Sequence, residues 1–95
     1  MEFGIYLRAE REMKRLSLRQ LGRLVGVSKQ FLFCIETGEV NPTPAICTQI
    51  ALHLALDRDV VMLMAGHTPP DVLTLLQEHP AAGCAILRRE LLKMM

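Results

Sequence analysis

Cysteine is scarce in this 95-residue sequence, and the three cysteines, Cys34, Cys47 and Cys84, form no CxxC pair. An odd number at wide spacing argues against a disulfide scaffold and against a zinc site. Tryptophan is absent and there is only one tyrosine, yet 51% of the residues are apolar. That fraction excludes a disordered chain. We expect free, buried thiols in a reducing compartment, and hence a cytoplasmic protein.

Long hydrophobic runs are also missing. The longest uncharged stretch, residues 40–56, is interrupted by two prolines, an asparagine, a glutamine and a histidine. A membrane-spanning helix needs about 20 mostly apolar residues, so no membrane span is expected. Charged residues recur from Glu2 to Glu12, where a secretory signal would carry its apolar segment. No secretory signal is expected either.

Residue patterns typical of catalysis are absent as well. The three histidines, His53, His67 and His79, are isolated from one another and from the cysteines, with no metal-ligand or triad-like spacing. For His53, a half-buried or surface position on a helix is the simpler interpretation. We therefore expect no enzyme activity, no cofactor and no metal.

Charge is nearly balanced overall, at +1, but it is divided unevenly along the chain. Residues 1–38 carry seven basic and four acidic side chains, a net +3, and residues 39–95 carry a net −2. This asymmetry suggests an anionic partner for the first half and a protein partner for the second. Ordinary solvated surface charge is the alternative.

The hydrophobic periodicity is helical throughout, and no segment alternates like a strand. Capping residues and breakers divide the pattern: Ser17, which forms a capping box with Gln20, then Gly26, Ser28, Thr43, Asp59 and Gly66. The expected helices cover residues 3–15, 18–25, 29–36, 44–54, 60–65, about 69–79 and 81–95. The sequence predicts an all-α fold with a five-helix domain over residues 1–66 and a C-terminal helical extension over residues 67–95.

Residues 17–38, SLRQLGRLVGVSKQFLFCIETG, are the most informative segment. Two short helices separated by a glycine-containing turn have the spacing of a DNA-binding helix-turn-helix unit. Gly22 permits a close helix crossing, and Gly26 supplies a positive φ without strain. Leu32 and Ile35 turn one side of the second helix inward, so its other side faces outward.

The same segment, continued through Asn41-Pro42, resembles the Cro/phage-repressor (XRE) family of regulators. The residues in register with the family pattern are Leu16-Ser17, Leu21-Gly22, Gly26-Val27-Ser28, Leu32, Ile35-Glu36, Gly38 and Asn41-Pro42. The resemblance extends over about residues 3–66 and implies a five-helix lambda-repressor-like domain. It also implies binding of double-stranded DNA in the major groove. The alternative is helix-turn-helix geometry used purely as scaffold.

The resemblance also implies roles for individual residues. Positions that face base edges are Lys29, Gln30 and Cys34, joined by Phe33, which either touches a thymine methyl group or packs on a neighbouring helix. Candidate phosphate contacts are Arg19, Arg23, Ser28 and Thr37. Leu18 stands where the family often has a phosphate-binding glutamine, and Arg19 is a candidate replacement. An ion pair between Arg11 and Glu36 would join the first helix to the recognition helix.

The C-terminal third carries more apolar side chains than a small domain can easily cover. The candidate dimer interface consists of Leu73, Leu76, Ile86, Leu87, Leu91 and Leu92. Two other uses are a different protein partner and an intramolecular cover over the helix bundle. A homodimer is favoured because two recognition helices, one DNA turn apart, read an inverted repeat.

Together these features predict a cytoplasmic DNA-binding transcriptional regulator, a repressor that binds an inverted-repeat operator as a homodimer. Repression follows because no activation or ligand-binding domain is evident. The alternative is an antitoxin or adaptor whose main partner is another protein, with secondary or no DNA binding.

Overall fold

A computed structural model describes residues 2–95, and these residues form seven α-helices and no strand. The predicted all-α class is confirmed. No helix in this range is long and apolar enough to cross a membrane. In chain order the helices are α1 (Phe3–Met13), α2 (Leu18–Val25), α3 (Lys29–Glu36), α4 (Pro44–Leu54), α5 (Arg58–Met64), α6 (Pro70–Glu78) and α7 (Pro80–Lys93).

Local side-chain caps begin the helices that bear the site. Ser17 accepts from the Gln20 backbone N–H at 3.0 Å while the Gln20 side chain accepts from the Ser17 N–H at 2.8 Å, so the predicted capping box is confirmed. Ser28 caps α3 by accepting from the Phe31 N–H. Thr43 caps α4 in the same way, with proline in the first turn. The predicted starts of α2, α3 and α4 are therefore confirmed.

The end of α1 differs from the prediction. The helix stops at Met13 instead of continuing to residue 15, because Arg15 adopts a positive φ of 57°. The chain then folds back, and the Leu16 N–H donates to the Arg11 carbonyl at 3.2 Å. This bond satisfies a terminal carbonyl that would otherwise have no partner.

The fifth helix also begins earlier than predicted. Asp57, rather than Asp59, is its cap: the Asp57 carboxylate accepts from the Asp59 and Val60 backbone N–H groups at 2.9 and 3.1 Å. Helix α5 therefore starts at Arg58 and ends at Met64. Helix α7 likewise starts one residue early, at Pro80, because a proline at the first helical position lacks only an N–H that needs no intrahelical partner.

The hydrophobic core lies within α1 to α5 and the residue that follows α5. Its members are Phe3, Leu7, Leu21, Val25, Leu32, Ile35, Cys47, Ile50, Ala51, Leu54, Val61, Met62 and Ala65. The helical periodicity also predicts inward positions for Met13 and Leu24, but both are exposed, Met13 at the last turn of α1 and Leu24 on α2. Successive helical residues lie about 100° apart, so Leu24 falls beside the buried stripe of its helix rather than on it. Of the cysteines, only Cys47 is buried, which corrects the expectation for the other two.

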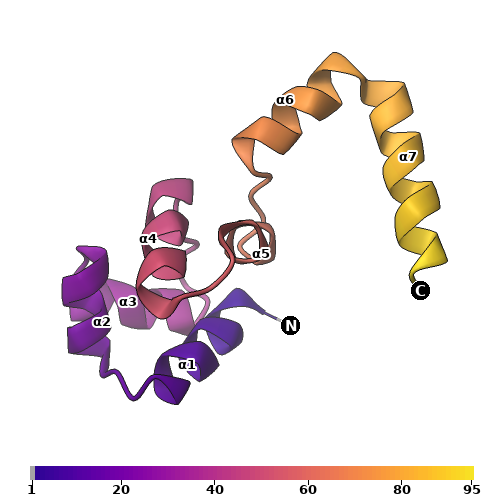
Figure 1. The fold of residues 1–95 in the computed structure, drawn as a ribbon. Coiled ribbons are helices and arrows are strands. Elements are labelled where there is room, and N and C mark those ends of the chain that lie inside the picture. Colours follow the sequence, from indigo (N-terminus) through magenta and orange to yellow (C-terminus); the bar gives the residue numbers. More distant parts are fainter. Residues whose placement is uncertain (1) are drawn as a thin grey trace.

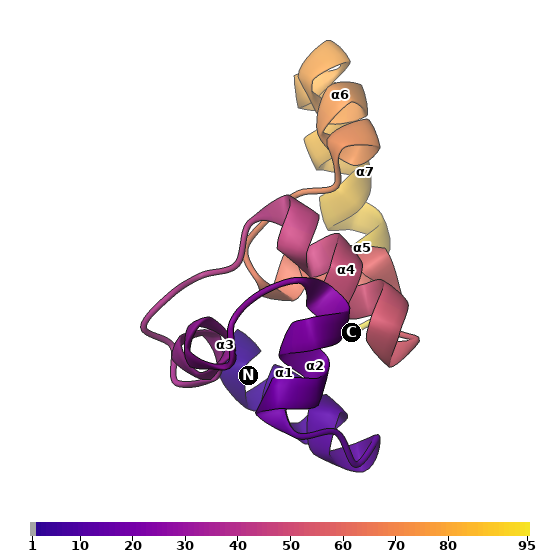
Figure 2. The ribbon, with the colours of Figure 1, turned by 90° about the vertical axis from the view of Figure 1, so that its left-hand side faces the viewer.

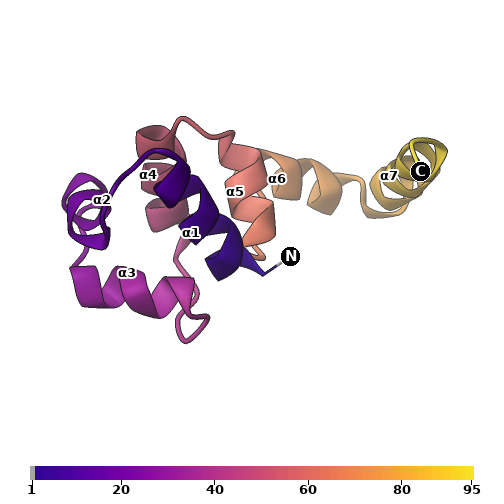
Figure 3. The ribbon, with the colours of Figure 1, turned by 90° about the horizontal axis from the view of Figure 1, so that it is seen from below.

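Helices α6 and α7 project from this body as an arm (Figure 1). Neither contributes a buried residue, although they contact each other. The arm lies at one end of the molecule's 44 Å long axis, and α2 and α3 lie at the other (Figures 1 and 3). The intramolecular cover considered for the C-terminal segment is therefore not the arrangement adopted.

The junction between body and arm is held by hydrogen bonds to the loop that follows α3. The Asn41 side-chain amide donates to the Ala65 carbonyl at 2.9 Å, and His67 Nε2 lies 2.7 Å from the Pro42 carbonyl oxygen. Pro42 and Pro69 are fully buried. These contacts fix the direction in which the chain leaves the body.

Candidate nucleic-acid interface

Helices α2 and α3 meet through a short turn in which glycine is required twice. A Cβ on Gly22 would lie 2.7 Å from the Val27 carbonyl oxygen, so no larger residue allows this approach. Gly26 ends α2 with φ 88°, in the left-handed region where glycine is unstrained. The two helices are thereby set at a fixed crossing.

The inner side of α3 anchors it to the body. Leu32 and Ile35 are almost completely buried, and they pack into the same core as Leu21 and Val25 of α2. Helix α1 approaches from the other side, where a Cβ on Gly4 would clash with the backbone at the C-terminal end of α3. Because this inner side is fully packed, the direction of the outer side is determined as well.

The outer side of α3 is open to solvent. Figures 2 and 3 show α3 at the edge of the body with no other element outside it. Lys29, Gln30 and Thr37 are exposed, Phe33 is 46% exposed and Cys34 is half-buried. Among residues 2–95, no hydrogen bond or ion pair occupies the Lys29 or Gln30 side chain. These two polar groups are free to bind an external partner.

Two hydroxyl groups flank α3, and their hydrogen bonds differ. Ser28 Oγ accepts from the Phe31 N–H at 3.0 Å, which leaves its own proton free to donate. Thr37 Oγ1 donates to the Cys34 carbonyl at 3.2 Å, and the Thr37 N–H donates to the Phe33 carbonyl. Thr37 thus uses both donors within the chain, and Ser28 is the better placed of the two to donate to a phosphate.

Arg11 and Glu36 join α1 to the end of α3. Arg11 Nε lies 2.7 Å from Glu36 Oε2, Nη2 lies 3.0 Å from Oε1, and Nη1 donates to the Leu16 carbonyl at 2.8 Å. The two side chains are only 11% and 5% exposed. Hydrogen bonding to Glu36 raises the pKa of Arg11 above its ordinary value, so the guanidinium stays charged at every accessible pH. This bidentate pair fixes the C-terminal half of α3 against α1.

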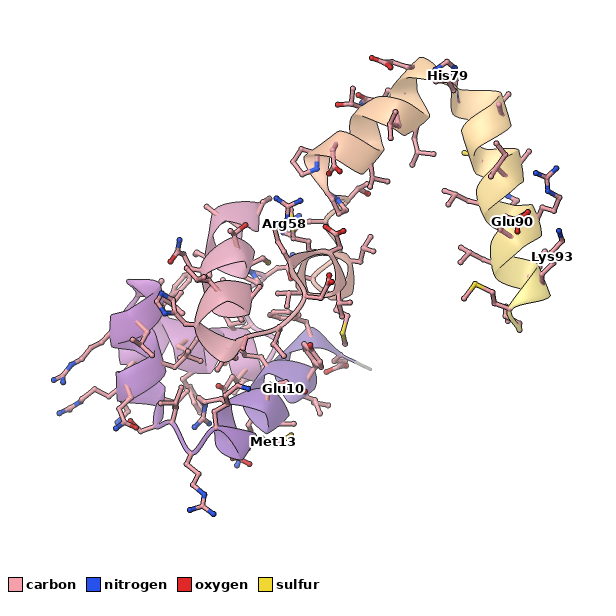
Figure 4. All side chains as sticks on the ribbon, in the orientation of Figure 1. Glu10, Met13, Arg58, His79, Glu90 and Lys93 are labelled. Atoms are coloured by element: carbon pink, nitrogen blue, oxygen red, sulfur yellow. The ribbon has the colours of Figure 1, made fainter. Side chains whose placement is uncertain are left out.

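Positive charge is concentrated near α2 and the start of α3. Arg19, Arg23 and Lys29 are exposed, and no carboxylate of residues 2–95 lies within ion-pair distance of them. Nitrogen-tipped side chains extend outward from the α2 side of the body (Figure 4). Because Arg11 is neutralised by Glu36, these exposed groups, rather than Arg11, are available to attract an anion.

Sequence reasoning did not single out Arg8, which lies at the same surface. A hollow of about 170 Å³ beside α3 is lined by Arg8, Arg11, Leu18, Phe33, Glu36 and Thr37. Within residues 2–95, Arg8 is engaged only by Glu12, at 2.9 Å in an exposed pair, and such pairs are weak. The available signal was its position one helical turn before Arg11, which places both arginines on the same side of α1.

The thiol of Cys34 faces the same surface in its protonated form. Partial burial, and then the nearby Glu39 carboxylate, raise the pKa of this cysteine above its ordinary value. Burial likewise raises the pKa of Cys47 in the core. Within residues 2–95 no group of three or more His, Cys, Asp or Glu side chains is placed to hold a metal ion.

Comparison with known proteins agrees with this geometry. A family model described as a helix-turn-helix domain matches residues 2–63. Two proteins of Mycobacterium tuberculosis, from strains CDC 1551 / Oshkosh and ATCC 25618 / H37Rv, are each 30% identical to this chain over 87 residues. Both bear the name of an uncharacterized HTH-type transcriptional regulator.

These relatives are longer than the present chain. The match covers 92% of this chain but 62% of each relative, so the chain spans less than two thirds of their length. No solved structure matches the chain.

Proposed function

Because this chain belongs to the helix-turn-helix domain family, we propose that it is a sequence-specific DNA-binding transcriptional regulator. It acts in the cytoplasm as a repressor that binds an inverted-repeat operator as a homodimer. A lambda-repressor-like (XRE) arrangement of α1 to α5 is part of this proposal. The observation that carries it is the exposed outer side of α3, with unpaired cations beside it and a buried inner side that fixes its direction.

Base recognition belongs to the outer side of α3 in the major groove. Lys29 donates to guanine acceptors, and Gln30 pairs with adenine through its amide. Phe33 contacts a thymine methyl group, and Cys34 contacts the neighbouring base edge. Support comes from the absence of competing contacts to Lys29 and Gln30 and from the exposure of half the Phe33 ring.

Phosphate contacts surround this helix. Arg19 and Arg23, one turn apart on α2, bind the backbone on one side, and Ser28 donates at the N-terminus of α3. Thr37 contacts the backbone at the other end of α3 by donating its hydroxyl proton to a phosphate oxygen in place of the Cys34 carbonyl. We add Arg8 to this set because it borders the same hollow as Phe33 and Thr37.

Dimerisation is assigned to the arm. The apolar side chains of this surface are Leu73, Leu76, Ile86, Leu87, Leu91 and Leu92, which the chain itself leaves half-buried or exposed. The same exposed surface favours the second candidate, an antitoxin or adaptor that binds a different protein there. The two candidates differ in how they respond to DNA and salt.

Salt-dependent binding to selected DNA is the test. A sequence selected from random DNA with the full chain should bind with an affinity that falls steeply as salt rises. The four guanidinium groups of Arg19 and Arg23 in a dimer alone give a log–log slope of about −3.6. The R19A/R23A variant should bind all sequences more weakly and with a shallower slope, and K29A/Q30A should change the sequence preference. Weak, sequence-independent binding at every salt concentration would refute the regulator and favour the adaptor.

A further inference from the structure

The arm formed by α6 and α7 cannot complete a hydrophobic core by itself. Its large apolar side chains are between 41% and 66% exposed at Leu73, Leu75, Ile86, Leu87, Leu91 and Leu92. Exposed apolar surface of this extent in a small protein marks an interaction site.

The connection between the two helices explains why they do not cover each other. A single residue, His79, separates α6 from α7. Antiparallel helices that pack side by side are joined by loops of about two to five residues. The helices therefore meet only at their shared end, where a Cβ on Gly83 would lie 2.8 Å from the Leu76 side chain, and they diverge from there as an open V (Figure 1).

The inside of this V is apolar. Leu87 and Leu91 follow Gly83 at intervals of four residues, so they lie on the side of α7 that faces α6. In Figure 4 the side chains on that side of α7 are mainly carbon, whereas the labelled Lys93 lies on the opposite side. On α6, Val72 precedes Leu76 by one turn and shares its side. The V is thus a groove with two apolar walls that diverge too far to touch.

We propose that the V is filled by α7 of a second copy of this chain, exchanged reciprocally, so that each α6 packs against the partner's α7. This pairing deepens the homodimer part of the proposed function and rests on it. Helix α7 forms one wall of its own groove and also fills the groove of the partner. A single two-fold axis between the copies therefore fills both grooves. The two arms then form a single core.

Helix charge supports a second copy and selects this pairing. Helix α6 carries two acidic and no basic side chains, a net −2. Helix α7 carries three basic side chains and one acidic, a net +2. Packing α6 on the partner's α7 brings opposite charges together, whereas α6 on α6 or α7 on α7 brings like charges together. The position of the arm, far from α3, leaves both recognition helices free (Figure 3).

Sedimentation of the full chain gives the first test. The wild-type protein should sediment as a dimer. Leu87→Glu, inside the V, should raise the dimer dissociation constant at least tenfold. Ala85→Glu is the control: Ala85 is exposed, lies two residues before Leu87, about 160° away around α7, and its substitution should have a much smaller effect. A monomeric wild type, or equal effects from the two variants, would overturn the proposal.

Charge reversal separates the exchanged dimer from a dimer of like helices. Gln77→Lys/Glu78→Lys changes α6 to +1, and Arg88→Glu/Arg89→Glu changes α7 to −2. Each variant alone should dimerise at least tenfold more weakly than wild type, and a one-to-one mixture should restore the dimer. Glu2→Lys/Glu39→Lys, which adds positive charge on the body, is the control and should leave the dimer unchanged. If the α6 variant alone dimerised as well as wild type, α6 would not contact the partner's α7.

Binding of a single half-site at low salt, followed by fluorescence, keeps this result apart from the proposed function. A wild-type chain that is monomeric, helical by circular dichroism and still able to bind the half-site counts against the arm pairing but not against DNA binding. A Leu87→Glu variant that is monomeric, equally helical and still able to bind the half-site supports the pairing.

Discussion

Replacing Glu36 with glutamine should destabilise the protein far more than any exposed charge change. The substitution keeps the shape of the side chain but leaves Arg11, only 11% exposed, facing a neutral amide. Breaking a buried pair by removing one charge costs about 3–5 kcal/mol, because the remaining charge stays desolvated. The bond from Arg11 to the Leu16 carbonyl persists, which favours the lower end, about 3 kcal/mol.

In a domain of this size, such a loss lowers the melting temperature by roughly 12 °C or more. Urea unfolding followed by circular dichroism measures the free-energy change directly. Glu12→Gln is the matched control, because its pair with Arg8 is exposed to solvent and such pairs contribute little to stability.

The double variant R11M/E36M completes the experiment. Two apolar side chains leave no unpaired charge, so the double variant should recover much of the stability lost in Glu36→Gln. If Glu36→Gln and Glu12→Gln agreed within about 0.5 kcal/mol, the pair would not be desolvated and α3 would be held by packing alone.

Three further substitutions or modifications test separate features. Gly22→Ala should cost about 1–3 kcal/mol in urea unfolding, because its Cβ would meet the Val27 carbonyl at 2.7 Å; an unchanged midpoint would mean that the crossing is loose. Asp57→Ala should lose about 1 kcal/mol through the missing cap of α5, while Asp59→Ala stays within about 0.5 kcal/mol; the reverse order would move the helix start. Because burial raises the pKa of Cys34, its alkylation at pH 8 should be slower than that of an unfolded control peptide and should accelerate as pH rises towards 10. Bound operator DNA should suppress this alkylation. Unhindered alkylation in the complex would mean that Cys34 is not part of the interface.

The parts of the fold that the sequence predicts well depend on residues close together in the chain. The Ser17–Gln20 capping box and the Ser28 cap each use groups three residues apart, and Gly26 needs only its own φ. Such local chemistry is visible in a sequence without knowledge of the packing. The outer side of α3 follows by elimination once its apolar residues are placed inward.

Features that depend on a choice between two suitable caps, or on contacts between residues far apart in the chain, are harder to predict from the sequence. Asp57 and Asp59 are both good caps, and only the path of the chain after α4 selects Asp57. Arg8 joins the α3 surface through the angle between α1 and α3, which no local pattern encodes. For the arm, composition indicates surplus apolar surface, but its separation from the body depends on the path through His67 and Pro69.

The two hydrogen bonds at the base of the arm fix the start of the arm relative to the body. Asn41 and His67 link the loop after α3 to the segment where the arm begins. The buried Pro42 and Pro69 restrict the backbone of these two segments. In the two-fold pair that we propose, joined through the arms, the separation of the two recognition helices would be set by this hydrogen-bonded junction and not by a flexible linker. The number of base pairs between the two half-sites of the proposed operator would then depend on this junction. Weakening the junction should broaden the permitted spacing before it lowers the affinity for either half-site.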